Sequence, residues 1–568
     1  MGKDSGFISA SNEDSFRSSH LLYFVFVSIV PAISHVLFSW AGYNPSDDGF
    51  ILAYSRRILE GQIPHLDFIS IRPVGSAILH LPVVLLGGGY TYWISRFVVW
   101  CEFAVMAAAW THVFSSFASL KVRLFDKTLF FFVAYIFSVH TFPVMAWHTI
   151  DGLLMISLGL VWTRKKKPAV KFIGFFFLGL SCLFKQSFIP AVFVLPFIWN
   201  EWKNKKTWVA IFLPGLLYSG YLLVAGAFGD AFIQLCFQTG IIQAGFISYL
   251  TEWITFPLGI IWGFLSCLLM YRRKLLNGVF KPNFLRAAGM TALGVSLFTY
   301  PAGLWMGRAV WNLAFWLFGI VAGTALYFFL FAKRSERGNV LKPVLSALVI
   351  AWSVSLSKGY NSPSLAAGIL ALVILLLIFS VFPSGAGKNV KRLFGLLKCA
   401  LLIMSVGAFV WARYNHIYLE RPASDLEYSL EDIFPGTKKI RTNENTFRFL
   451  KDLDRAVEKY RGEEFTIIPD CAGYWVKASQ VNPLSIDWLQ PVELKNQRLV
   501  DRLENEIRSK QGLILIVQKV HAEYLFREFR PIPENSAYKL VNFIRTGGRK
   551  FAGTEYFDMY RFLYEGEK

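Results

Sequence analysis

Long apolar segments separated by short polar and basic stretches run through the first 412 residues of this 568-residue chain. A helix needs about 20 apolar residues to cross the hydrocarbon core of a bilayer. This pattern predicts a polytopic α-helical membrane protein with about 13 transmembrane helices. The segment 73–88 is also apolar but is bounded by Pro and Gly, and we expect it at the membrane surface. The thirteen predicted spans are 21–41, 93–118, 128–146, 151–163, 172–184, 188–200, 207–227, 253–271, 287–305, 309–331, 342–357, 363–383 and 394–412.

The pattern changes in residues 413–568, where shorter apolar runs alternate with charged stretches. Apolar positions in Thr446–Arg461 recur at helical spacing, whereas Phe465–Ile468 and Leu513–Val517 are typical of buried strands. Leu494–Lys510 predicts a second helix, and Thr546–Gly548 predicts a turn between two late strands. These elements indicate a small α/β domain. It carries no catalytic motif, so we expect a lid or docking module.

Basic residues are concentrated in the apolar part of the chain. The sequence has 58 Lys and Arg against 38 Asp and Glu, a formal net charge of +20. Residues 413–568 hold 25 basic and 24 acidic residues, which leaves 33 basic and 14 acidic residues in 1–412. This excess follows the positive-inside rule of membrane proteins, and it does not form the basic face of a nucleic-acid-binding module. We therefore expect contact with membrane lipids and no nucleic acid.

The basic clusters also orient the chain. They all fall on one side of the predicted membrane, which the positive-inside rule assigns to the cytoplasm. The chain then divides into a cytoplasmic tail (1–20), a transmembrane domain (21–412, with a first external loop at 42–92) and an extracytoplasmic domain (413–568). The six cysteines show no disulfide framework, and there is no Asn-glycosylation sequon. Both observations favour a bacterial inner or archaeal plasma membrane, with the C-terminal domain in the periplasm or outside the cell.

Two adjacent carboxylates, Asp47 and Asp48, follow the first apolar segment. Carboxylates near a bilayer are costly unless they are solvated, paired or bound to a metal. Ser46 is placed to cap a helix over 47–60, whose apolar stripe predicts an amphipathic helix lying on the outer surface. Two interpretations follow: helix capping alone, or a catalytic base beside a metal ligand.

Several basic residues near the predicted outer face are not explained by topology. Lys358 and Tyr360 lie in the last outer loop and suit a phosphate, with Arg308 as a rival. Lys185 lies near a membrane boundary, where it would bind an anion or snorkel to the interface. Arg56, Arg57 and Arg72 complete the set, and the first two are expected to touch lipid headgroups.

Ionisable residues inside the predicted spans need partners. Glu102 lies within a span, and we expect it to pair with a nearby Arg. We expect His80 and His140 to be structural.

An ordered series of short motifs surrounds the two carboxylates. It resembles the first external loop and following spans of GT-C glycosyltransferases, polytopic enzymes that use polyprenyl-phosphate sugars and include protein-mannosyl transferases. The span count and C-terminal domain resemble the lipid A aminoarabinose transferase branch, whereas the Asp-Asp-Gly form is closer to mycobacterial arabinosyltransferases. Asp48, where many members have Glu, and Leu66, where an aromatic is common, leave the subfamily open. The motifs are Asp47-Asp48-Gly49, Gly61–Phe68, Arg72-Pro73, Gly87–Gly89 with Arg96, Asp151, and Gly179–Lys185.

The resemblance implies an inverting glycosyltransferase at the outer face of the membrane. Asp47 would be the base, and Asp48 and Asp151 would be further catalytic acids. A divalent metal (Mg, Mn or Ca) would be shared by Asp48 and Asp151, with His148 as an added ligand. Partners would be a polyprenyl-phosphate-linked sugar donor and a glycan, lipid or protein acceptor. The implied donor-phosphate residues are Lys358, Tyr360, Arg308 and Lys185, and the implied acceptor or loop-positioning residues are Arg56, Arg57, Asp67 and Arg72.

Two other classes of protein stay open. One is a polytopic transporter or flippase of a lipid-linked or anionic substrate, which would place ionisable residues near the membrane midplane. The other is a non-catalytic assembly subunit, which would not require Asp47, Asp151 and outer-face cations together.

Overall fold

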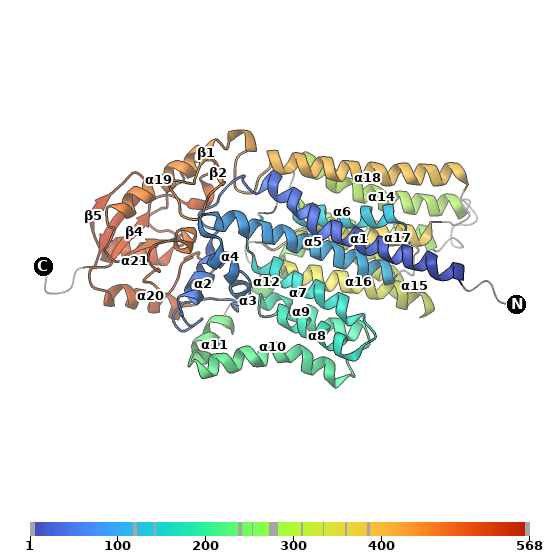
Figure 1. Cartoon of the computed structure of the whole chain (residues 1–568), viewed down its shortest axis with the longest axis horizontal. Helices are drawn as coiled ribbons and strands as arrows, with labels where there is room; N and C mark the ends of the chain where they lie inside the picture. Colours follow the sequence, from blue (N-terminus) through green and yellow to red (C-terminus); the bar gives the residue numbers. More distant parts are fainter. Residues whose placement is uncertain are drawn as a thin grey trace.

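The computed structural model places a long bundle of helices at one end of the molecule and a compact α/β region at the other (Figure 1). It describes residues 6–117, 122–140, 142, 144–236, 241–252, 254–271, 282–307, 310–332, 334–357, 360–382 and 387–562. The described chain begins with α1 at the outer end of the helical bundle and ends after β6 in the α/β region (Figure 1).

Each of the thirteen predicted apolar segments overlaps a helix. The helical bundle contains α1 (Gly6–Phe38), α5 (Thr91–Phe117), α6 (Leu124–Val139), α7 (His148–Thr163), α8 (Pro168–Ser181), α9 (Ile189–Ile198), α10 (Lys205–Val224), α11 (Phe228–Cys236), α12 (Ile241–Thr251), α13 (Thr255–Tyr271), α14 (Pro282–Trp305), α15 (Val310–Phe331), α16 (Arg334–Ser355), α17 (Ala367–Val381) and α18 (Lys388–Asn415). Short 3-10 helices η2 (Gln186–Phe188) and η4 (Pro363–Ala366) precede α9 and α17.

Within the described residues, six helices are long and apolar enough to cross a membrane, or seven if the bent pair α12 and α13 counts as one span. Four further apolar helices are only 10–17 residues long. These helices are compatible with a polytopic membrane protein, while the count of thirteen spans stays a prediction.

Close helix packing in the bundle depends on small residues. A side chain at Gly263 would approach the Ile320 carbonyl oxygen to 2.2 Å, and one at Gly323 would approach the Ile260 carbonyl oxygen to 2.0 Å. Together with Gly259 and Gly319 these residues form a glycine pair, four positions apart, on each of α13 and α15. Such pairs let two helix backbones meet directly, which is a common packing mode in membranes.

Short helices of the predicted external loop connect the bundle to the α/β region. They are α2 (Phe50–Leu59), α3 (Gly75–Leu79), α4 (Leu81–Leu86) and η1 (Gly88–Tyr90). The apolar segment 73–88 therefore folds as two short helices separated at His80.

The α/β region contains a four-stranded sheet in the order β3-β4-β6-β5, with β3 and β4 parallel and the other pairs antiparallel. Ile467 on β3 pairs with Ile516 on β4, and both are buried. The elements are η5 (Ala423–Asp425), β1 (Tyr428–Ser429), β2 (Arg441–Thr442), α19 (Glu444–Glu458), β3 (Phe465–Ile468), η6 (Ala472–Val476), α20 (Gln497–Ser509), β4 (Ile514–Gln518), η7 (Ala522–Tyr524), α21 (Lys539–Gly547), β5 (Arg549–Gly553) and β6 (Phe557–Arg561).

Most of the predicted elements of this region are confirmed, but one is wrong. The two strand runs form β3 and β4, and the two helical patterns form α19 and α20. Thr546–Gly548 is not a turn between strands, because it lies at the end of α21. The buried Leu540, Val541 and Ile544 have helical spacing and extend this helix up to the start of β5.

Candidate functional site

The segment that carries Asp47 and Asp48 lies between the helical bundle and the α/β region. α2 begins only at Phe50, and its N-cap residue, Gly49, makes no side-chain capping bond. The capping role predicted for Ser46 is therefore wrong. The Ser46 hydroxyl instead donates a hydrogen bond to the Asp470 carboxylate, which follows β3.

α2 is buried on several sides and does not lie on a surface. Most of its residues, including Phe50 and Tyr54, are buried. At its start, the Gly49 backbone meets Gly473 of η6 so closely that a side chain at position 49 would come within 2.2 Å of the Gly473 Cα atom. The glycine of the Asp-Asp-Gly motif therefore permits contact between the two parts of the protein.

Asp48 forms an ion pair with Arg96, which lies near the start of α5. A guanidinium nitrogen of Arg96 lies 3.0 Å from the Asp48 Oδ1 atom, and both side chains are nearly buried. The same guanidinium donates to the carbonyl oxygens of Ser39 and Gly42 at 2.8 and 2.7 Å. The backbone N–H of Asn44 donates to the other Asp48 oxygen at 2.8 Å. These contacts fix the loop after α1 and occupy both carboxylate oxygens.

Asp47 has a different environment, without a basic partner among the described residues. Its Oδ2 atom lies 3.5 Å from the Tyr418 hydroxyl. Burial raises the pKa of Asp47 to about 8, and the negative charges of Asp470 and Asp48 act in the same direction. Glu523 adds a smaller effect of the same sign. Asp47 is thus a carboxyl group whose proton is exchanged near neutral pH.

Asp470 is the acidic neighbour that the sequence did not reveal. Its side chain is buried, and it accepts hydrogen bonds from Ser46 and from Gln490, the latter at 2.6 Å. Burial raises its pKa to about 7, although these hydrogen bonds act against the shift. The available signal was its position directly after the buried strand β3 and Pro469, where a polar side chain is carried to a strand end.

A small cavity of about 30 Å³ opens beside this segment. Asp48, Arg96, Arg413 and Tyr418 contribute to its lining. Arg413, near the end of α18, donates to the Phe142 carbonyl oxygen at 2.9 Å and lies 5.0 Å from the Trp100 ring centroid. Its Nε atom is buried and has no hydrogen-bond partner among the described residues. The side chains of Tyr418, next to Asp47, and Arg413 therefore line the same small cavity.

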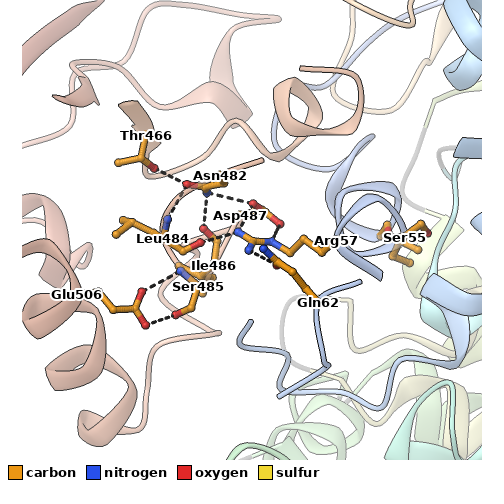
Figure 2. Close-up of polar contacts among 11 residues, drawn as sticks. Ser55, Arg57, Gln62, Thr466, Asn482, Leu484, Ser485, Ile486, Asp487 and Glu506 are labelled. Atoms are coloured by element: carbon orange, nitrogen blue, oxygen red, sulfur yellow. Dashed lines mark hydrogen bonds and ion pairs between the residues drawn. The ribbon is translucent and has the colours of Figure 1, made fainter. Parts of the chain in front are cut away.

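Arg57 connects α2 to the α/β region and is not placed to touch lipid headgroups. Figure 2 shows its side chain reaching into the 482–487 loop. It bonds both carboxylate oxygens of Asp487, at 2.6 and 2.8 Å, and the Leu484 carbonyl oxygen at 2.6 Å. Both charged side chains are buried. Arg56, in contrast, pairs with Glu60 on the same helix at 2.6 Å, where both side chains are partly exposed.

The remaining loop-positioning candidates have local or bridging roles. Asp67 accepts a hydrogen bond from the Ile63 backbone N–H at 2.6 Å and closes a turn. Arg72 pairs with Glu493 of the α/β region at 2.7 Å. Arg57 and Arg72 therefore attach the external loop to the α/β region at two points.

The structure describes two of the four predicted donor-phosphate residues, Lys185 and Tyr360, in different surroundings. Lys185 is buried and donates to the Thr149 hydroxyl at 2.9 Å. Burial, aided by the positive charge of Arg72, lowers its pKa to about 7. The Tyr360 ring packs 4.7 Å from Phe142, whose ring lies 6.0 Å from Tyr418. Arg308 and Lys358 lie outside the described residues.

Asp151 lies close to His80 and Glu102, two residues that we did not expect beside it. His80, Glu102 and Asp151 place one ligand atom each within 4.8 Å of one another, and all three side chains are buried. The His80 Nε2 atom lies 3.3 Å from Asp151 Oδ1. Glu102 therefore has Asp151 and not an Arg as its near neighbour.

Asp48, Asp151 and His148, the metal ligands predicted from the sequence, do not form a group with metal-ligand spacing. Within the described part of the chain, the one group with metal-ligand spacing contains neither Asp48 nor His148. His148 lies one helical turn before Asp151, and its ring packs 5.5 Å from Phe50.

Comparison of the chain with protein-family models, with curated proteins and with solved structures gives no match. The site must therefore be interpreted from its own geometry.

Proposed function

We propose that the protein transfers a sugar from a polyprenyl-phosphate donor to an acceptor hydroxyl at the outer face of a bacterial inner or archaeal plasma membrane. The acceptor class is a cell-envelope glycan, a glycolipid or a protein. The single observation that supports this proposal most is the state of Asp47, a carboxyl with a pKa near 8 at the junction of the bundle and the α/β region.

This carboxyl suits a general base. A base works best when its pKa lies near the working pH, since it then has both an ionised population and a strong affinity for the proton. An ordinary aspartate, with a pKa near 3.8, is a far weaker proton acceptor. Burial beside Asp470 gives Asp47 the stronger basicity, and perturbed carboxyls of this kind are concentrated at functional sites.

The adjacent cavity is lined by basic side chains that suit a phosphate group. Its volume of about 30 Å³ has room for only a few water molecules, so a sugar phosphate requires the cavity to widen. Arg413 lines this cavity, and guanidinium groups bind phosphate through paired hydrogen bonds. Arg96 is committed to Asp48 and to carbonyl groups, so we assign phosphate binding to Arg413, with Lys185 and Tyr360 as further candidates.

The proposed reaction balances as a single displacement. The acceptor oxygen forms a bond to the anomeric carbon as the bond from that carbon to the phosphate oxygen breaks. The acceptor proton passes to Asp47, and the electron pair of the broken bond leaves on the polyprenyl phosphate. Attack opposite the leaving group inverts the anomeric configuration.

Free polyprenyl phosphate is the product that tests this reaction. We expect it to accumulate in source-cell membranes that contain the protein and acceptor, and to fall to background with Asp47→Asn. The matched control is Asp432→Asn, an exposed aspartate of the α/β region, which should release product at the wild-type rate. Equal release by Asp47→Asn would refute the role of Asp47.

A transporter or flippase is the second candidate, and one observation favours it. Glu102 is buried within α5, a candidate membrane helix, where an ionisable group commonly marks a transport pathway. A transporter would move its lipid-linked substrate without releasing free polyprenyl phosphate. The same assay therefore separates the two functions.

A further inference from the structure

His80, Glu102 and Asp151 form a buried cluster whose charges are not balanced by basic side chains. His80 lies between α3 and α4, Glu102 lies on α5, and Asp151 lies on α7. In the described part of the chain, no Lys or Arg forms an ion pair with either carboxylate, and the only recorded ion-pair partner is His80. Two buried carboxylates without a counter-charge are strongly unfavourable.

Several polar atoms of the cluster are available to a ligand. The Oε2 atom of Glu102 and the Oδ2 atom of Asp151 are buried without hydrogen-bond partners among the described residues, and so is the Nδ1 atom of His80. Such orphaned atoms are rare in folded proteins and usually indicate an ion or water. The two carboxylate oxygens, together with the His80 Nε2 atom that faces Asp151, form a candidate set of metal ligands.

We propose that His80, Glu102 and Asp151 bind one divalent transition-metal ion, with Zn²⁺ or Mn²⁺ as the chemical class. Two ligand atoms bound to one ion at about 2.1 Å lie roughly 3.0–3.5 Å apart. The distance of 3.3 Å between His80 Nε2 and Asp151 Oδ1 fits this geometry. An imidazole nitrogen with two carboxylates suits Zn²⁺ or Mn²⁺, whereas Mg²⁺ and Ca²⁺ prefer sites built from oxygen alone.

The ion would join three separate segments of the protein. It would connect α5 and α7 to the α3–α4 junction, and α3 in turn supports α2. The Ser55 hydroxyl of α2 donates to the Ala77 carbonyl oxygen of α3 at 2.8 Å. Metal binding would therefore stabilise the α3–α4 junction, which supports α2 and the Asp47 segment that precedes it. This inference does not depend on the proposed sugar transfer.

Metal content of the purified full-length chain tests the proposal directly. The protein is stripped with a chelator, loaded separately with Zn²⁺ and Mn²⁺, passed through a desalting column and analysed by inductively coupled plasma mass spectrometry. We expect about one ion per chain for at least one metal, and a higher thermal midpoint for the loaded than for the stripped protein.

Substitutions then identify the ligands. His80→Ala, Glu102→Gln and Asp151→Asn should each lower the affinity for the ion at least ~10-fold, because changes in outer-shell groups alone cost that much. His148→Ala is the matched control: this histidine is buried on the same helix as Asp151 but lies outside the cluster. It should keep the wild-type ion content.

Glu102→Gln also separates the proposal from a simpler explanation, in which the two carboxyls share one proton. A glutamine can donate to Asp151 and would leave the stripped protein folded with an unchanged thermal midpoint, so loss of the ion could not be ascribed to misfolding. The proposal is overturned if the wild-type chain holds neither metal, if Glu102→Gln retains the wild-type ion content, or if His148→Ala loses the ion as fully as the three ligand variants.

Discussion

Asp47→Asn should make the protein more stable while it removes the proposed base. The folded state raises the pKa of Asp47 from its ordinary value of 3.8 to about 8. The folded protein therefore binds this proton more tightly than the unfolded chain does. The stability linked to this group is fully present below pH 3.8, is lost as the pH rises toward 8, and is constant above that value. Asparagine carries no charge, so the variant avoids this loss.

The size of the effect follows from the same pKa change. The difference between 3.8 and about 8 corresponds to roughly 6 kcal/mol at most. Asp47 is partly exposed, so solvent screening and local relaxation reduce this figure. We expect Asp47→Asn to gain under ~1 kcal/mol at pH 5 and about 2–3 kcal/mol at pH 8.5, relative to the wild type.

Thermal unfolding of the two proteins at a series of pH values measures this gain. Asp432→Asn serves as the control, because its exposed carboxylate should give no pH-dependent difference. The reasoning is refuted if the midpoint difference between Asp47→Asn and the wild type is the same at pH 5 and pH 8.5, or if the variant becomes less stable as the pH rises.

Three further predictions concern the contact between the external loop and the α/β region, and the pH dependence of the proposed sugar transfer. Arg57→Ala leaves the buried Asp487 carboxylate without its counter-charge, with only the Asn482 amide as a partner among the described residues, and should cost about 3–5 kcal/mol of unfolding free energy. The neighbouring Arg56→Ala removes only a partly exposed pair and should cost under ~1 kcal/mol, both measured by denaturant unfolding. Gly49→Ala forces the junction apart because of the Gly473 contact, so limited proteolysis should cut the α/β region faster than in Gly220→Ala, where the added methyl group meets open space. The rate of sugar transfer should rise with pH up to about 8 and then level off, since Asp47 must be ionised; a rate that falls over this range would contradict the assignment.

Local sequence patterns predicted the elements of this fold well. Apolar runs identify the bundle helices and the strands β3 and β4, because these patterns depend on neighbouring residues alone. Asp48 shows where such patterns fail. Its partner, Arg96, lies on α5 and reaches it only after α1 and α5 pack together. A motif of adjacent carboxylates therefore did not reveal that one of them forms an ion pair with Arg96.

Contacts between distant segments account for what the sequence did not reveal. Asp470 reaches the Asp47 segment from the end of β3, more than 400 residues later in the chain. Arg57 appeared to face a membrane but is buried against Asp487, because the α/β region covers α2. Glu102 correctly indicated a need for a partner, but its nearest neighbour is a second acid and not an Arg. Each of these pairings is decided by tertiary packing and not by local spacing.

The central claim, that Asp47 is the base of a sugar transfer, is tested most directly by the glycans of the source cell. Mass spectrometry of envelope glycans, glycolipids and glycoproteins would compare cells lacking the protein with cells that express the wild type, Asp47→Asn or Asp432→Asn at equal levels. The account predicts that one glycan loses a sugar in the deletion and in Asp47→Asn, and that the wild type and Asp432→Asn restore it. Full restoration of that sugar by Asp47→Asn would contradict the account.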